Sequence, residues 1–181
     1  MRIGRPGEGR EGVSFETPVA MLMECHRRIE QQCETLARLV PHVAAHGSDA
    51  AAAEAARAVM RYFDVAAPKH HVDEEDDLFP ALIEAMAGSD AVCVREMTGV
   101  LLAEHRDLER RWGALRAMLD QLVRGEAAVI AAADVSAFAD LYAKHIAREE
   151  RELLPMAERL IDAATMARIG AAMRRRRGAA D

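Results

Sequence analysis

One pattern of eighteen residues occurs twice in this chain, and no other feature of the sequence constrains the fold as strongly. Residues 63–80 align with residues 138–155 without a gap. The positions that agree are Phe63/Phe138, Lys69/Lys144, His70/His145, Glu74/Glu149, Glu75/Glu150, Leu78/Leu153 and Pro80/Pro155. The chain therefore contains two copies of one structural element.

A shorter pattern repeats in the segments that precede these copies. The stretch His26-Arg-Arg-Ile-Glu30 matches His105-Arg-Asp-Leu-Glu109 in its histidine, arginine, apolar residue and glutamate. The chain is thus interpreted as two related hairpins. A pseudo-twofold arrangement of these hairpins would aim equivalent residues at one central volume.

Composition and periodicity predict that the hairpins are helical. Hydrophobic residues are 51% of the chain, but aromatic residues are only 4% and alanine is abundant. Alanine has the highest helix propensity, whereas strands favour β-branched and aromatic residues. From Val19 to Val40 apolar side chains recur at steps of three and four residues, which is typical of one helix face.

Capping and turn residues predict where the helices begin and end. The first helix begins at Pro18 behind a Thr17 cap and is ended by Pro41 and Gly47. Proline removes one backbone hydrogen bond and crowds the preceding turn. We therefore expect Pro68 to kink the second helix, Pro80 to break it, and Pro155 to end the fourth. The expected helices cover residues 18–40, 49–86, 91–124, 134–154 and 163–174. Ser48 or Asp49 caps the second, Gly88-Ser89-Asp90 is the turn before the third, Gly125 ends the third, and Asp162 precedes the fifth.

These helices predict an all-α fold. Four long helices with short connections form an antiparallel up-down-up-down four-helix bundle, here with a short C-terminal fifth helix. We expect a flexible leader at residues 1–16, the bundle at residues 17–174 and a basic tail at residues 175–181. The four arginines at 174–177 and the acids at 73–77 are interpreted as solvated charges.

Histidines and glutamates at repeated positions predict a metal site. The inward-facing candidates, one or two from each helix, are His26, His70, Glu74, His105, His145 and Glu149. Buried ionisable groups are costly unless they pair or bind a cation. Two ions fit this set, each with two imidazoles, while the two glutamates bridge them. Glu109 is a candidate seventh ligand, and Glu30 is assigned to the surroundings.

The repeat also separates the neighbours His70 and His71. Each has a glutamate four residues later, Glu74 and Glu75, so each pair would share one helix face. The second copy keeps the first histidine but has Ile146 in place of His71. We therefore place His71 at the rim of the site or in solvent, and we give Glu75 no ligand role.

Several other classes are excluded by composition and spacing. The net charge is −6, so no nucleic acid or anionic membrane is expected as a partner. No apolar run is long enough to span a bilayer. Three cysteines without a C-x-x-C motif indicate a reducing cytoplasm rather than a disulfide framework. The Glu-x-x-His spacing of ferritin-like di-iron sites and the H-E-x-x-H of zinc proteases are both absent.

The ordered motif H…H-x-x-x-E…H…H-x-x-x-E resembles the hemerythrin-like (HHE cation-binding) domain family, bacterial single-domain type, over about residues 18–170. The resemblance implies a non-haem di-iron centre with an oxo or hydroxo bridge, held by the six residues named above. Zinc or manganese are possible substitutes, because imidazole with carboxylate also suits them. Unlike oxygen-carrying hemerythrins, the chain has Glu109 instead of a second third-helix histidine, and H-x-x-x-E in the fourth helix.

The function that this resemblance implies is the binding or reduction of a small oxidant. Oxygen, nitric oxide and peroxide are the candidate ligands, in oxidative or nitrosative stress or in iron homeostasis. Alternatives are an iron-handling or sensing module without turnover, and repair of damaged iron–sulfur centres. A metal-free interaction bundle is the remaining alternative. Tyr142, one turn before His145, is assigned to the core or to the edge of the site.

Overall fold

The structure is a computed structural model that describes residues 14–87, 91–126 and 129–179, and these residues form helices without any strand. The all-α prediction is therefore confirmed for this part of the chain. The elements are α1 (Pro18–His46), α2 (Ala50–Arg61), η1 (Tyr62–Ala66), α3 (Ala67–Val72), η2 (Asp73–Leu78), α4 (Phe79–Ala85), α5 (Ala91–Val123), α6 (Ala132–Arg148), η3 (Glu149–Leu153), α7 (Leu154–Leu160) and α8 (Ala163–Arg177), where η marks a π-helical turn.

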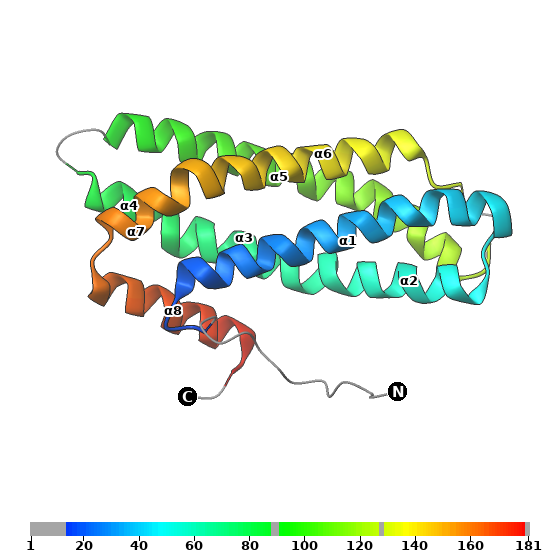
Figure 1. The fold of residues 1–181 in the computed structure, drawn as a ribbon, viewed down its shortest axis with the longest axis horizontal. Helices are drawn as coiled ribbons and strands as arrows, with labels where there is room; N and C mark the ends of the chain where they lie inside the picture. Colours follow the sequence, from blue (N-terminus) through cyan, green and yellow to red (C-terminus); the bar gives the residue numbers. More distant parts are fainter. Residues whose placement is uncertain (1–13, 88–90, 127–128, 180–181) are drawn as a thin grey trace, which may run out of the picture.

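Four long helical segments lie side by side in Figure 1: α1, the run from α2 to α4, α5, and the run from α6 to α7. Helix α1 packs against α2 and α6, and α5 packs against the same two helices. Helix α1 ends and α2 begins at one end of the molecule, whereas α4 ends and α5 begins at the other (Figure 1). Helix α8 lies outside the four segments, below α1 at the lower left of Figure 1, and contacts α1 and η2.

A layer of buried polar side chains divides the core along its length. One apolar cluster includes Ile29 and Phe138, and the other includes Leu22 and Leu153. On α1 and α5, His26 and His105 lie between the residues of the two clusters, and Glu74 and Glu149 do so on the other two segments, which pass through the clusters in the reverse order. Apolar packing on both sides thus holds the four segments together around a polar layer.

Contrary to the prediction, the internal prolines do not break or end the helical segments. Three of the four internal prolines follow a π-helical turn. Pro68, Pro80 and Pro155 occupy the second positions of α3, α4 and α7, directly after η1, η2 and η3. Because a π turn is wider than an α turn, it makes room for a ring that would crowd the preceding carbonyl. The predicted break at Pro80 and end at Pro155 are therefore wrong.

The first helix also continues through its proline. Pro41 lies inside α1, which ends only at His46, followed by Gly47 with φ +69°. Leu39 and Val43 on either side of Pro41 are buried, so packing stabilises this turn despite the lost hydrogen bond. The expected end of the first helix at Pro41 is wrong, whereas Gly47 follows its last residue.

Helix caps mostly follow the prediction. Asp49 and Asp162 each accept a hydrogen bond at 2.8 Å from the backbone N–H three residues later, which caps α2 and α8. Gly125, with φ +73°, follows the end of α5. The turn expected at residues 88–90 lies outside the described residues. Helix α8 continues to Arg177, beyond its expected end.

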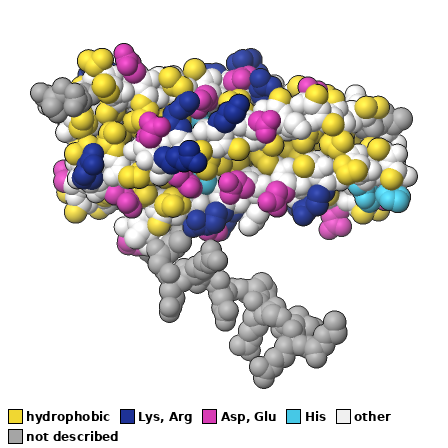
Figure 2. Space-filling view, turned by 45° about the horizontal axis from the view of Figure 1, so that its top comes forward, with side chains coloured by type: hydrophobic (Ala, Val, Ile, Leu, Met, Phe, Trp, Pro, Cys, Tyr) yellow, Lys and Arg dark blue, Asp and Glu magenta, His cyan; other side chains and the backbone are white. Residues whose placement is uncertain are grey.

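Acidic and basic side chains are interspersed on the face that Figure 2 shows, with apolar side chains between them. Neither sign dominates that face, which agrees with the modest net charge of −6. Among the described helices, none combines the length and apolar character that a membrane span requires.

Gly170 allows α8 to approach the start of α1 closely. A Cβ at this position would overlap the backbone carbonyl of Phe15 and lie 3.3 Å from Pro18 Cγ. We expect Gly170→Ala to lower the free energy of unfolding by roughly 2 kcal/mol, because backbone has to shift. The matched control Gly113→Ala in α5 has nothing within 4 Å and should gain about 0.5–1 kcal/mol. Urea titration measures both changes, and equal stability of the two variants would contradict the close approach.

Candidate metal centre

Six of the seven predicted ligands meet in the buried polar layer. They come from all four long segments: His26 from α1, His70 from α3, Glu74 from η2, His105 from α5, His145 from α6 and Glu149 from η3. None of the six is more than 1% exposed. The helical periodicity that buries the apolar faces therefore also aims these polar groups inward.

The six residues form two groups of four that share both glutamates. One group joins His26 and His70 to the glutamates, and the other joins His105 and His145 to them, with ligand atoms within 4.8 Å of one another in each group. Glu74 places its oxygens 3.2 Å from His70 Nε2 and 3.4 Å from His105 Nε2.

Glu149 repeats this geometry on the other side of the layer. Its oxygens lie 3.2 Å from His145 Nε2 and 3.1 Å from His26 Nε2. Each carboxylate thus contacts one histidine of each group. A carboxylate in this position can bridge two cations.

Polar atoms in this layer lack the hydrogen bonds that buried groups normally make. Both oxygens of Glu74 and of Glu149, and Nε2 of His26 and of His70, make no well-aligned hydrogen bond among the described residues, although carboxylate and imidazole lie only 3.1–3.4 Å apart. Buried polar groups without partners are costly. Cations bound by these atoms would remove that cost, so the residues fit a metal centre.

Charge in the layer favours cations as well. Burial opposes protonation of His26, but Glu149 and Glu74 outweigh it and raise the pKa of His26 to about 11. Burial likewise opposes protonation of His145, and Glu149 outweighs it and raises that pKa to about 9. Burial disfavours the Glu149 carboxylate, but His145 and His26 hold its pKa below the usual range. A cation must replace protons here, so its affinity should fall as the pH falls.

A second set of carboxylates orients three of the four histidines. Glu150 lies 2.9 Å from His26 Nδ1 and Glu75 lies 2.7 Å from His105 Nδ1. Glu104 lies 2.9 Å from His145 Nδ1. Such contacts leave Nε2 free for a metal and increase the basicity of the imidazole. Sequence reasoning missed this role, although Glu75 and Glu150 were identical positions in the repeat.

Comparison with known proteins agrees with this geometry. The model of the hemerythrin HHE cation-binding domain matches residues 17–157. The chain belongs to this family. An uncharacterised protein of Haemophilus influenzae is 29% identical over 170 residues, which cover 94% of this chain and 95% of that protein.

His71 is not at the rim of the hemerythrin-type site, as the sequence suggested, but inside the core. Its ring stacks on His105 with centroids 4.0 Å apart and an angle of 13° between planes. Burial and the neighbouring His105 lower the pKa of His71 well below its usual value, so its ring is neutral. The equivalent Ile146 is also buried. An isoleucine in the second copy was therefore a signal for a core position.

Glu109 lies outside both groups of ligands. Its side chain is 59% exposed and pairs with Arg106 at 3.6 Å. Glu74 already supplies the carboxylate near His105 from another helix, so a seventh ligand from α5 is not needed to complete the group. Glu30, the matching residue of α1, is also exposed.

Two charged runs that were expected to be solvated meet beside the site. Asp73 is fully buried and pairs with both Arg176 and Arg177 of α8. Arg176 also pairs with Asp77 at 2.8 Å. The expectation is wrong for these residues, because α8 folds back onto η2 and removes Asp73 from water.

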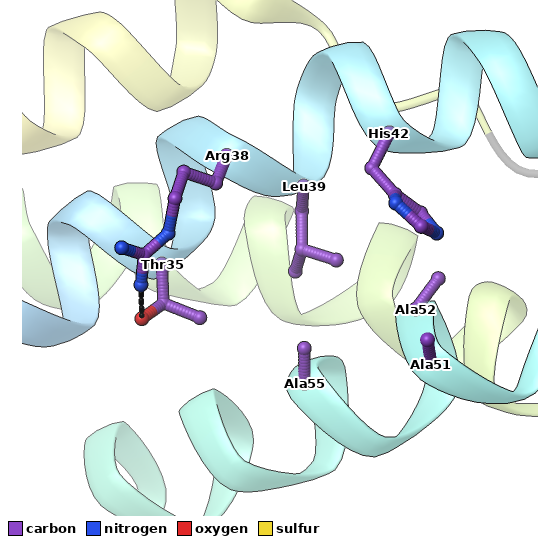
Figure 3. A pocket seen from close by; sticks show the side chains of 7 residues that line it. All are labelled: Thr35, Arg38, Leu39, His42, Ala51, Ala52 and Ala55. Atoms are coloured by element: carbon purple, nitrogen blue, oxygen red, sulfur yellow. Dashed lines mark hydrogen bonds between the residues drawn. The ribbon is translucent and has the colours of Figure 1, made fainter.

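A separate cleft between α1 and α2 has no part in the site (Figure 3). It has a volume of about 220 Å³, and Arg38 and His42 lie on its α1 side. His42 contacts the capping Asp49 at 3.0 Å, while Arg38 donates a hydrogen bond to Thr35. These polar groups have partners, so this cleft offers no additional ligand set.

Proposed function

We propose that the protein is a non-haem di-iron protein that binds or reduces a small oxidant such as oxygen, nitric oxide or peroxide. The observation that carries this proposal is the pair of buried ligand groups that share Glu74 and Glu149. The proposed scaffold is an antiparallel up-down-up-down four-helix bundle, which the positions of the helix ends in Figure 1 support.

The donor set supports iron as the metal. Each group offers two imidazoles and two carboxylates, a combination that suits iron, with manganese or zinc as substitutes. When bound, two irons would supply electrons and a coordination position for the oxidant. The protein's own part is to hold the Nε2 atoms in place through Glu75, Glu104 and Glu150. The apolar clusters on both sides limit the access of water.

A cleft beside the site supports a small ligand. It has a volume of about 320 Å³ and is lined by Phe63, Leu108, Trp112, Tyr142 and His71 among others. His71 stacks directly on His105, so the cleft extends to the wall of one ligand group. The lining is mostly apolar and aromatic, which favours an uncharged molecule over an anion.

A second candidate is an iron-handling or sensing module without turnover, which includes delivery of iron for repair of iron–sulfur centres. A cleft of about 430 Å³ between α1 and α6 favours it, because Glu30, Glu34 and Asp140 line it and Tyr142 lies at its wall. Three carboxylates there would attract a cation. For either candidate we propose a cytoplasmic role in stress or iron homeostasis, without nucleic acid or membrane partners.

Metal analysis and optical spectra of protein purified in air test the proposal. We expect about two irons per chain, one for each ligand group, with absorption bands of an oxo-bridged centre. The reduced protein should then react with peroxide or nitric oxide repeatedly when a reductant is supplied. A single reaction without cycling would favour the sensing module. Stoichiometric zinc without iron would contradict both candidates.

A further inference from the structure

The internal repeat relates the two ligand groups, and most of their contacts obey this relation. The first group contains His26 and His70, and the second contains His105 and His145. His26 and its partner Glu150 correspond to His105 and its partner Glu75. Their Nδ1-to-oxygen distances are 2.9 Å and 2.7 Å. The contacts of Nε2 with the shared glutamates also correspond. The distance is 3.2 Å for His70 with Glu74 and 3.2 Å for His145 with Glu149.

The carboxylate partner of His145 is a departure from this relation. His145 Nδ1 has a carboxylate partner in Glu104, which directly precedes His105. The corresponding residue, which directly precedes His26, is Cys25. His70 is the counterpart of His145, and its Nδ1 is buried without a hydrogen-bond partner among the described residues. One histidine of the first group is therefore not oriented by a carboxylate.

The orienting carboxylates of the second group are themselves held by arginines. Glu104 pairs with Arg148, and Glu75 pairs with Arg106 at 3.0 Å. In the first group, Glu150 is 34% exposed, and no arginine of the described residues pairs with it. The second group is thus oriented by two anchored carboxylates, and the first by a single, more exposed one.

Next to the first group, an acidic residue also replaces the basic residue that the second group has at the same position of the repeat. Asp73 occupies the place that Arg148 has in the second copy, and its arginine partners come from α8. Arg177 interacts with both Asp73 and the Cys25 thiol. Helix α8 therefore neutralises Asp73 beside the first group. Beside the second group, Arg148 pairs with Glu104, and both residues belong to the four long segments.

We propose that the two cation positions are inequivalent, with the His105–His145 position holding its cation more tightly and the His26–His70 position releasing its cation first. The inference rests on the proposed two-cation function. Loss of a hydrogen-bond partner behind a histidine ligand typically costs about 10–100-fold in metal affinity. In this proposal Cys25 weakens cation binding at the His26–His70 position, because it provides no carboxylate partner for His70 Nδ1.

Chelator titration of the full chain tests this. The protein is loaded with iron(II) without oxygen, and iron release to a chromogenic chelator is followed per chain. We expect two steps separated by at least about tenfold in chelator concentration. Loading with zinc, which has no redox chemistry, should give the same two steps. Release of both cations in a single step would overturn the inequivalence and leave the two-cation function intact.

Reciprocal variants assign the steps to the two positions. Cys25→Glu should move the first step toward the second, since position 25 corresponds in the repeat to Glu104, whose carboxylate contacts the counterpart of His70. Glu104→Cys should move the second step toward the first by about 10–100-fold. Cys25→Ser offers no carboxylate and should keep both steps. If Cys25→Glu does not fold, Glu104→Gln, which retains the side-chain size, replaces it as the test.

Two results would separate the failures. If Glu104→Cys or Glu104→Gln leaves both steps unchanged, the inequivalence does not arise from the orienting carboxylates and the inference is wrong. If the wild-type chain never takes up a second cation, the two-cation function fails with it. Circular dichroism of each metal-free variant confirms that the helices are intact before the titrations are compared.

Discussion

Glu74→Gln should remove both cations, with a loss of affinity of more than about 100-fold at each position. The reason is that its two oxygens lie next to His70 in one group and next to His105 in the other, at 3.2 Å and 3.4 Å. A neutral amide offers a single weak oxygen ligand and cannot bridge two cations. Iron per chain after dialysis against a weak chelator is the measurement.

Two further variants control for this result. Glu109→Gln removes a carboxylate that is exposed and paired with Arg106, so both cations should remain. His70→Ala removes a ligand of only one group, so one cation should remain. The shared role of Glu74 would be refuted if its glutamine variant kept two cations, or if Glu109→Gln lost them.

The double substitution Arg176→Met with Arg177→Met should lower the free energy of unfolding by about 3–5 kcal/mol. Asp73 is fully buried, and these two arginines are its partners. Their removal leaves an uncompensated charge inside the protein, which is far more costly than loss of a surface pair. Thermal unfolding of the chelator-treated protein should show the midpoint falling by roughly 6–20 °C.

A matched control lies in the same helix. Arg175 is exposed, so Arg175→Met should change the free energy of unfolding by no more than about 0.5 kcal/mol. Adding Asp73→Asn to the double variant removes the unpaired charge and should restore part of the stability. Failure of Asp73→Asn to restore any stability would show that the arginines act through packing instead.

Sequence alone was sufficient for the helices and for most of the candidate ligands. Helix formation is local, so apolar periodicity and the caps at Asp49 and Asp162 placed the helices near their observed bounds. The repeat was equally informative, because residues that recur in two related hairpins occupy equivalent places in space. It selected His70 and Glu74, and it contained Glu75 as an identical position whose meaning was missed.

The path of the chain through its prolines could not be read from local rules. Pro80 and Pro155 are helix breakers by propensity, yet they follow η2 and η3, the π-helical turns that contain Glu74 and Glu149. Leu78 with Phe79 and Leu153 with Leu154 are buried where the two turns end, and this packing outweighs the missing hydrogen bond. π-helical turns are frequent at functional sites, and here they include both shared carboxylates.

The sequence by itself determined the helical segments and the six histidines and glutamates that meet in the polar layer, because both follow from spacing along a helix and from the repeat. Only the tertiary structure decided which side chains from different helices meet. It excluded Glu109, buried His71 against His105, and brought the arginines of α8 onto Asp73. These outcomes depend on distances between segments far apart in the chain, which no local pattern encodes.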